Sequence, residues 1–221
     1  KAGIIKKNIP VLIGEKNKET DRIFIDKAKR ESSKIFFTED FLSSDLDLNL
    51  KANYQRKNMN TAFAAIQILF GNKITNDIFK RGILNLRGNT LLRGRWEKVM
   101  NKPLVIADVA HNEEGFKEVI SEINRIKAHK KIFVLGFVKD KPIEKIIKLF
   151  PKEGIYFFSS PKISRALSSK NLKLILKNTD INFEIFESIQ EAYKRALNNA
   201  SKEDFIFVGG SNFTVSEILN P

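Results

Sequence analysis

Three polar side chains follow a short apolar run near the middle of the chain. The run Leu104–Ala107 leads into Asp108, and His111 and Asn112 come within four residues of that aspartate. Open α/β sheets bind ligands at the carboxyl ends of their strands, so side chains in this position can reach a ligand. A carboxylate can accept the hydroxyls of a ribose, and a histidine can donate to developing negative charge. Arg95, thirteen residues before Asp108, offers a cation to a phosphate or an adenine ring.

These residues also have a structural interpretation. Asp108 or His111 can cap a helix that starts near Glu113, and Arg95 can form a salt bridge between domains. The residue pattern alone leaves both interpretations open.

Strands and helices alternate regularly after Arg93. Apolar runs predict strands at 103–108, 131–136, 154–159, 182–186 and 204–209, and helical periodicity predicts helices at 113–128, 141–150, 166–178 and 188–200. This alternation is typical of a parallel sheet with helices on both faces. We therefore expect residues 93–221 to form a doubly wound, Rossmann-like α/β domain, with Gly209 and Gly210 permitting a tight turn after the last strand.

Residues 1–92 contain fewer strands. The pattern predicts strands at 9–14 and 34–38 and helices at 18–32, 58–70 and 75–85, the last capped by Thr75. Residues 41–51 are expected to form a loop or an edge strand, and residues 86–93 a linker. Because two strands do not make a convincing independent core, we expect residues 1–92 to be part of another α/β domain.

The composition narrows the classes of function. The absence of cysteine excludes disulfides, thiolate zinc sites and cysteine nucleophiles, and it suits a reducing compartment. No apolar run approaches the roughly 20 residues that cross a bilayer. The net charge of +13 indicates either attraction to anions or a lysine-rich solvated surface. Its basic residues are spread along the chain, without an arginine-rich arm or zinc finger, so nucleic acid is not the favoured partner.

Several motifs occur in an order that resembles folylpolyglutamate synthase and dihydrofolate synthase, members of the Mur ligase superfamily. The most specific are Gly94-Arg95-Trp96-Glu97 and, after it, Asp108-Val109-Ala110-His111-Asn112. The resemblance covers essentially the whole chain. Its weaker landmarks, in the same order, are Lys1-Ala2-Gly3-Ile4-Ile5, Tyr54-Gln55-Arg56-Lys57-Asn58, Asp140-Lys141, Ser164-Arg165-Ala166 and Gly209-Gly210-Ser211.

The resemblance also implies what this sequence lacks. These ligases begin with a P-loop ATPase region that contains Gly-Thr-x-Gly-Lys-Gly-Ser, and no phosphate loop of any type occurs here. We therefore expect residues 1–92 to be the C-terminal part of the central ATPase domain and residues 93–221 to be a complete Mur ligase C-terminal domain. We also expect the 221-residue chain to be inactive by itself.

The resemblance implies an enzyme that uses ATP and Mg²⁺. In the family, ATP phosphorylates a carboxylate of dihydropteroate or a reduced folate, and the amine of L-glutamate attacks the acyl phosphate. The sequence does not separate the two synthase activities. We expect a cytoplasmic monomer whose partners are ATP, L-glutamate and a folate or pteroate, and which binds neither nucleic acid nor membrane. Two alternatives stay open: a Mur-type ligase for another acid and amino acid, and a non-catalytic basic module that binds nucleotides.

The resemblance implies a nucleotide site built from several positions. Asn58 lies at the position where the family has an asparagine that contacts the edge of adenine. The alternative is that Asn58 is an ordinary residue at the start of a helix. Arg95 and Asp108 are similar to nucleotide contacts from the C-terminal domain. Further candidates for cofactor binding, with loop solvation as the alternative for the last two, are Asn112, Lys141 and Arg165.

Two positions are candidates for catalysis. His111 is similar to a histidine near the phosphates and the substrate. Lys1 resembles a lysine that can be carbamylated and then helps to hold a second Mg²⁺, so it is a metal ligand only as a carbamate; a frayed terminus is the alternative. Tyr54 replaces a histidine that the family usually has, so that role does not carry over. His129, in a lysine-rich turn, is expected to be solvated surface.

Overall fold

The computed structural model describes residues 1–41 and 52–220, which form two compact units, Lys1–Leu91 and Leu92–Pro221. The boundary between the units lies one residue before the predicted one. Of the segment predicted as a loop or an edge strand, only Phe41 is described, at the end of a 3-10 helix, η2 (Thr38–Phe41). Residues 42–51 lie outside the described residues.

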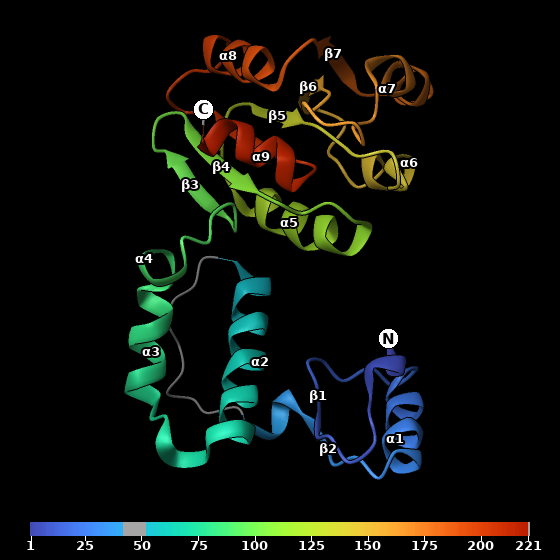
Figure 1. Ribbon diagram of the computed structural model, residues 1–221. Coiled ribbons are helices and arrows are strands. Elements are labelled where there is room, and N and C mark those ends of the chain that lie inside the picture. The colour runs from blue at the N-terminus through green and yellow to red at the C-terminus, as the bar shows by residue number, and fades with distance from the viewer. Residues whose placement is uncertain (42–51, 221) are drawn as a thin grey trace. The chain divides into compact units, whose positions relative to one another are not determined.

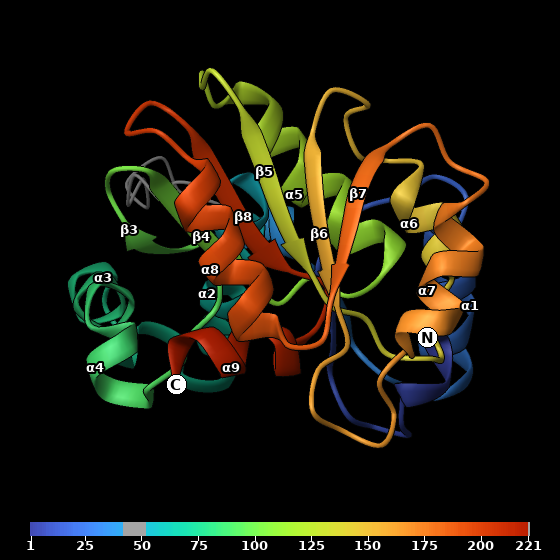
Figure 2. The ribbon, with the colours of Figure 1, turned by 90° about the horizontal axis from the view of Figure 1, so that it is seen from above.

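The second unit contains a six-stranded sheet in the order β3-β4-β8-β5-β6-β7. Five strands run parallel, as predicted, and lie side by side in Figure 2: β4 (Leu104–Asp108), β8 (Phe205–Gly209), β5 (Lys131–Leu135), β6 (Ile155–Ser159) and β7 (Asn182–Phe186). The sequence pattern missed β3 (Glu97–Met100), which pairs antiparallel with β4 at the sheet edge. The mostly parallel sheet confirms the predicted α/β class.

Helices cover both faces of this sheet (Figure 1). One face carries α5 (Glu113–Arg125) and α6 (Ile143–Ile147), and the other carries α8 (Ile189–Asn199) and α9 (Asn212–Leu219). The remaining helix, α7 (Ser169–Leu176), packs beside β6 and β7. The chain moves outward from β4 through β5 and β6 to β7, and then returns to place β8 between β4 and β5. This reversal explains why helices lie on both faces.

The two faces of the sheet differ in chemistry. Phe133 and Phe207 point to the α5 face, where Phe116 of α5 lies 6.5 Å from Phe207 between ring centroids. Their neighbours along the strands, Val134 and Val208, belong to an aliphatic cluster with side chains of α8 and α9. Successive strand side chains alternate between faces, and both faces are buried, so the strands appear in the sequence as continuous apolar runs.

We expect Phe116→Ala to destabilise the second unit by about 3–5 kcal/mol, because it removes a fully buried ring from the aromatic face. Urea unfolding followed by circular dichroism measures this change. Phe213→Ala on α9, where the side chain is 40% exposed, is the matched control and should have little effect. Equal effects of the two substitutions would contradict this description of the core.

The carboxylate of Asp204 organises the opposite, amino end of the sheet. It is buried, and its Oδ1 accepts from the backbone of Lys130 at 2.9 Å while its Oδ2 accepts from the backbone of Ser201 at 2.7 Å. Burial alone would raise the pKa of Asp204, but the hydrogen bonds from Ser201 and Lys130 outweigh it and lower that pKa below its usual value.

This lowered pKa predicts an acid-sensitive contribution to stability. Because the pKa of Asp204 is lower in the folded chain, its contribution is complete above the unfolded value of about 3.9 and is lost as the pH falls through the folded value. Asp204→Asn should therefore be less stable than the wild type at pH 7, and the difference should narrow below about pH 4. Urea unfolding between pH 7 and pH 3 tests this; a difference independent of pH would contradict it.

Among its described residues, the first unit has one two-stranded parallel sheet, formed by β1 (Val11–Ile13) and β2 (Ile35–Phe37), with α1 (Asp21–Arg30) between them in the chain. Two short 3-10 helices, η1 (Ala2–Ile4) and η4 (Gly71–Lys73), also belong to this unit. No helix of the described residues is long and apolar enough to span a membrane.

Helices α2 (Asn53–Phe70) and α3 (Asn76–Leu84) pack through Met59, Phe63 and Phe79. Thr75 caps α3, as predicted. Two predictions were wrong: α2 begins five residues before Asn58, and residues 86–90 form a short helix, α4 (Leu86–Thr90), in place of a linker. The start of α2 has no side-chain cap and α4 is a single turn, so neither left a clear signal.

Candidate functional site

The carboxyl ends of three parallel strands meet where the direction of the crossovers reverses. Asp108, at the end of β4, pairs with Gly209 of β8, and Leu135, at the end of β5, pairs with the same glycine from the other side. A reversal of this kind is the usual ligand position in an open α/β sheet. The predicted residues of the second unit lie on the loops that leave this edge.

Asp108 is almost completely buried, at 3% exposed, and it is hydrogen-bonded on both sides. Its Oδ2 accepts from the backbone of Trp96 at 2.7 Å, and its Oδ1 accepts from the backbone of Ala110 at 2.8 Å. The carboxylate therefore joins the segment before β3 to the turn after β4. The helix-cap interpretation of Asp108 and His111 was wrong, because Asn112 caps α5 by accepting from Gly115 at 2.8 Å.

The Gly94–Glu97 motif forms a turn that requires glycine at its first position. Gly94 has φ +70°, and a Cβ there would lie 2.7 Å from Val215 and 2.8 Å from Val109. Trp96 also has a positive φ, +51°, which is unusual for a bulky residue. Glu97 closes the turn, since its Oε2 accepts from the backbone of Gly94 at 2.8 Å.

Three residues of the motifs are exposed at this edge, Arg95, His111 and the α5 cap Asn112. Arg95 lies in the middle of the turn, and His111 lies just before α5. The Nδ1 of His111 is 3.1 Å from the carbonyl oxygen of Val109. Because a carbonyl only accepts, this contact places a proton on Nδ1 and leaves Nε2 for a ligand.

The loops after β5 and β6 bring Asp140, Lys141 and Arg165 together. A backbone hydrogen bond joins the two loops, in which the amide of Lys139 donates to the carbonyl oxygen of Arg165 at 2.9 Å. Arg165 Nη2 lies 3.1 Å, and Lys141 Nζ 3.7 Å, from the same Oδ2 of Asp140. A hydrogen bond from its own backbone amide, and then the bond from Arg165, lower the pKa of Asp140. Two cations around one carboxylate leave this group net positive, which suits an anionic ligand.

The turn after β8 is tied to the end of β5 by a residue that the sequence did not single out. Ser211 caps α9 by accepting from the backbone of Thr214 at 3.1 Å. The hydroxyl of Thr214 in turn donates to the carbonyl of Gly136 at 2.8 Å. The available signal was Ser211, a residue type preferred as a helix N-cap, which marks the start of α9 but does not point to Thr214.

Asn58 and Lys1 belong to the first unit, and both are exposed. Asn58 lies in the second turn of α2, so the interpretation as a helix-start residue was wrong. Lys1 precedes a 3-10 helix, and its carbonyl accepts from Ile4 at 3.2 Å. Within the described residues, no cluster of three or more histidine, cysteine or acidic side chains could hold a metal ion. Lys1 would supply one metal ligand, and only as a carbamate.

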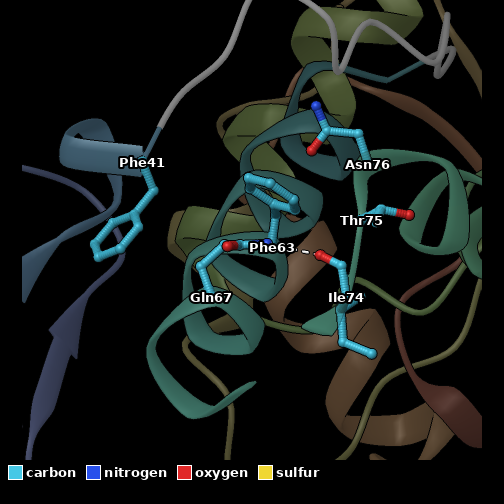
Figure 3. Close-up of a pocket in the computed structure, with 6 residues that line it drawn as sticks. All are labelled: Phe41, Phe63, Gln67, Ile74, Thr75 and Asn76. Atoms are coloured by element: carbon cyan, nitrogen blue, oxygen red, sulfur yellow. Dashed lines mark hydrogen bonds between the residues drawn. The ribbon is translucent and has the colours of Figure 1, made fainter. Parts of the chain in front are cut away.

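The first unit also has a hollow of about 380 Å³. Figure 3 shows its lining residues, where Gln67 donates to the carbonyl of Ile74 at 3.0 Å. The lining contains no charged side chain and none of the predicted site residues; it consists of Phe41, Phe63, Gln67, Ile74, Thr75 and Asn76. We therefore assign no chemistry to it.

We compared the chain with known protein families and with known proteins. Residues 94–212 match the family model described as Mur ligase, glutamate ligase domain. The chain belongs to the Mur ligase family. This match covers more than half of the chain and confirms the resemblance that the motifs indicated.

Curated Mur ligase relatives include dihydrofolate synthase/folylpolyglutamate synthases from two Buchnera aphidicola subspecies. The enzyme of subspecies Schizaphis graminum is 29% identical over 237 residues, covering 100% of this chain and 54% of the relative. That of subspecies Acyrthosiphon pisum is 34% identical over 168 residues, covering 73% of this chain and 39% of the relative. The chain thus spans about half the length, or less, of these relatives.

Solved Mur ligase structures share the fold. Escherichia coli FolC in complex with DHPP and ADP matches with a TM-score of 0.80 at 23% identity, over 99% of this chain and 54% of that one. Mycobacterium tuberculosis folylpolyglutamate synthase complexed with ADP matches with a TM-score of 0.83 at 18% identity, over 99% of this chain and 56% of that one.

We expect Asp108→Asn to destabilise the second unit by about 1–3 kcal/mol, because an amide has one acceptor oxygen in place of two and leaves one buried amide unpaired. Thermal unfolding measures the loss. Asp140→Asn, at an exposed carboxylate of the same sheet edge, is the control and should lower the melting temperature much less, because exposed ion pairs contribute little to stability. An unchanged melting temperature for Asp108→Asn would show that its two hydrogen bonds do not support the fold.

Proposed function

We propose that this chain is part of an ATP- and Mg²⁺-dependent ligase that adds L-glutamate to dihydropteroate, to a reduced folate, or to both. The relative from Buchnera aphidicola subspecies Schizaphis graminum, named dihydrofolate synthase/folylpolyglutamate synthase, aligns with the entire chain. The solved structure of a bifunctional folylpolyglutamate synthase/dihydrofolate synthase with Mn, AMPPNP and L-glutamate bound matches with a TM-score of 0.75 at 20% identity. These likenesses support a reaction among a nucleotide, a metal ion and glutamate.

The observation that carries the proposal is the group of basic side chains at the carboxyl edge of the sheet, of which Lys141 is half-buried and the others are exposed. Arg95 and His111 lie near the end of β4, and Lys141 and Arg165 follow β5 and β6. Guanidinium and ammonium groups suit phosphates and carboxylates, which are the groups that an ATP-dependent glutamate ligase must bind.

Asp108 and Asn112 stay in the proposed nucleotide site, chiefly as residues that shape its loops. A carboxylate oxygen can accept more than one hydrogen bond, so a ribose hydroxyl can still approach Asp108. Asn58 is the proposed adenine contact from the first unit, where an amide can both donate and accept.

The proposed chemistry depends mainly on position and charge. The amine of glutamate attacks an acyl phosphate, and negative charge develops on oxygen as the amide bond forms. We assign His111 the task of donating to this charge from Nε2, which requires that both ring nitrogens carry a proton. Mg²⁺, when bound, would neutralise phosphate charge, with carbamylated Lys1 as its one proposed ligand among the described residues.

The exposed apolar surface of the first unit supports the proposal that residues 1–92 are the C-terminal part of a larger ATPase domain. Two parallel strands are too few for an independent sheet. Large apolar side chains that are more than half exposed include Ile4, Ile23, Leu69, Leu84 and Leu91. On this basis the 221-residue chain alone should be inactive. We further propose that the protein is a cytoplasmic monomer that does not bind membrane. Its basic residues form no arginine-rich arm or zinc finger, so we also propose that it does not bind nucleic acid.

A second candidate is a Mur-type ligase for another acid and amino acid. A UDP-N-acetylmuramoyl-L-alanyl-D-glutamate--2,6-diaminopimelate ligase from Buchnera aphidicola subspecies Baizongia pistaciae is 32% identical over 140 residues, which is 58% of this chain. The folate-type relatives cover more of the chain, which favours the first candidate. A non-catalytic module would bind nucleotide without any turnover.

We expect the full-length gene product to form ADP and a glutamylated product from ATP, Mg²⁺, L-glutamate and dihydropteroate or tetrahydrofolate. A coupled enzyme assay of ADP release and mass spectrometry of the pteridine product measure the reaction. The 221-residue chain, assayed in parallel, should give neither product. Turnover only with muramoyl peptide acceptors would favour the second candidate, and ligase activity of the 221-residue chain alone would reject the proposed division of the enzyme.

A further inference from the structure

We infer that Glu97 is a positioning residue of the nucleotide site, which holds Arg95 in the direction of the ligand. The inference rests on the proposed role of Arg95 as a nucleotide contact. Glu97 is part of the Gly94–Glu97 motif, yet neither the motif nor the proposed chemistry gives it a task of its own.

The carboxylate of Glu97 makes two different contacts. Its Oε2 accepts from the backbone of Gly94 at 2.8 Å. Its Oε1 accepts from Arg93 at 2.8 Å from Nη2 and 3.1 Å from Nε. The side chain of Glu97 is only 12% exposed, so these charge-assisted bonds are shielded from water.

Arg93 connects the carboxylate of Glu97 to the rest of the second unit. Its Nη1 donates to the carbonyl of Leu219, at the end of α9, at 2.6 Å. The start of α9 is itself tied to the end of β5 through the bond from Thr214 to Gly136. The Gly94–Glu97 turn is therefore anchored to an element that packs on the sheet.

Arg95 lies between two residues whose backbone amides are hydrogen-bonded to carboxylates. The amide of Gly94 donates to Glu97, and the amide of Trp96 donates to Asp108. Both flanking residues have positive φ, a conformation that non-glycine residues adopt only when their surroundings enforce it. Two carboxylates thus fix the backbone on either side of one exposed cation, so the cation is oriented before a ligand arrives.

A double-mutant cycle on the full-length gene product separates positioning from stability. The variants are Glu97→Gln, Arg95→Ala and the two combined, with Glu184→Gln as the control. Glu184 is exposed on β7, where it pairs with Arg195 at 3.7 Å, so the same chemical change is made away from the turn. Calorimetric titration gives the affinity for ADP, and thermal unfolding gives the stability of each variant.

We expect Arg95→Ala to weaken ADP binding roughly tenfold and Glu97→Gln to weaken it roughly threefold to tenfold. Because Glu97 acts through Arg95, adding Glu97→Gln to Arg95→Ala should cause no further loss of affinity. The melting temperature should fall by the same amount when Glu97→Gln is introduced in either background. Glu184→Gln should bind ADP like the wild type.

An equal loss of affinity from Glu97→Gln with and without Arg95 would overturn the inference, and so would unchanged affinity of Glu97→Gln. If Glu97→Gln does not fold, Arg93→Gln removes a partner of the same carboxylate and is tested in the same cycle with the same expectation. ADP binding without glutamylation of any acceptor would reject the ligase proposal and leave the cycle interpretable. A wild type that binds no ADP would overturn the nucleotide site and this inference together.

Discussion

The buried carboxylate of Asp108 is the interaction on which the candidate site depends. A charge that is 3% exposed is stable only when it is hydrogen-bonded, and this one accepts from two backbone amides, those of Trp96 and Ala110. The two amides belong to segments on opposite sides of β4. One side chain therefore determines both how the chain enters the sheet at β3 and how it leaves β4 toward α5.

The two motifs consequently divide into residues that build the edge and residues that face outward from it. Gly94 satisfies a steric requirement, Glu97 and Asp108 hold backbone amides, and Asn112 caps α5. Arg95 and His111 are exposed and are not used in this way, while Asn112 is exposed but caps the helix. Fixed spacing in such a motif thus reflects the construction of the turn as much as contact with a ligand.

The sheet beneath this edge is packed on both faces. An aromatic layer packs against α5 and an aliphatic layer against α8 and α9, so both faces are buried. At the amino end, Asp204 joins Lys130 and Ser201 much as Asp108 joins its two partners at the carboxyl end. Buried carboxylates that accept from backbone amides therefore connect loops at both ends of the sheet, Asp108 at the carboxyl end of β4 and Asp204 at the amino ends of β5 and β8.

The sequence by itself determined the five parallel strands, most of the helices and the family, because buried strands and amphipathic helices leave local apolar patterns. It did not show β3, whose residues are mostly exposed at the sheet edge, nor the cap of α5, which the sequence placed at Asp108 or His111 and the structure places at Asn112. Only the tertiary structure decided which polar groups build the site. The deciding bonds join residues far apart in the chain, 12 residues for Trp96 and Asp108 and 126 for Arg93 and Leu219, and local periodicity carries no information about such pairs.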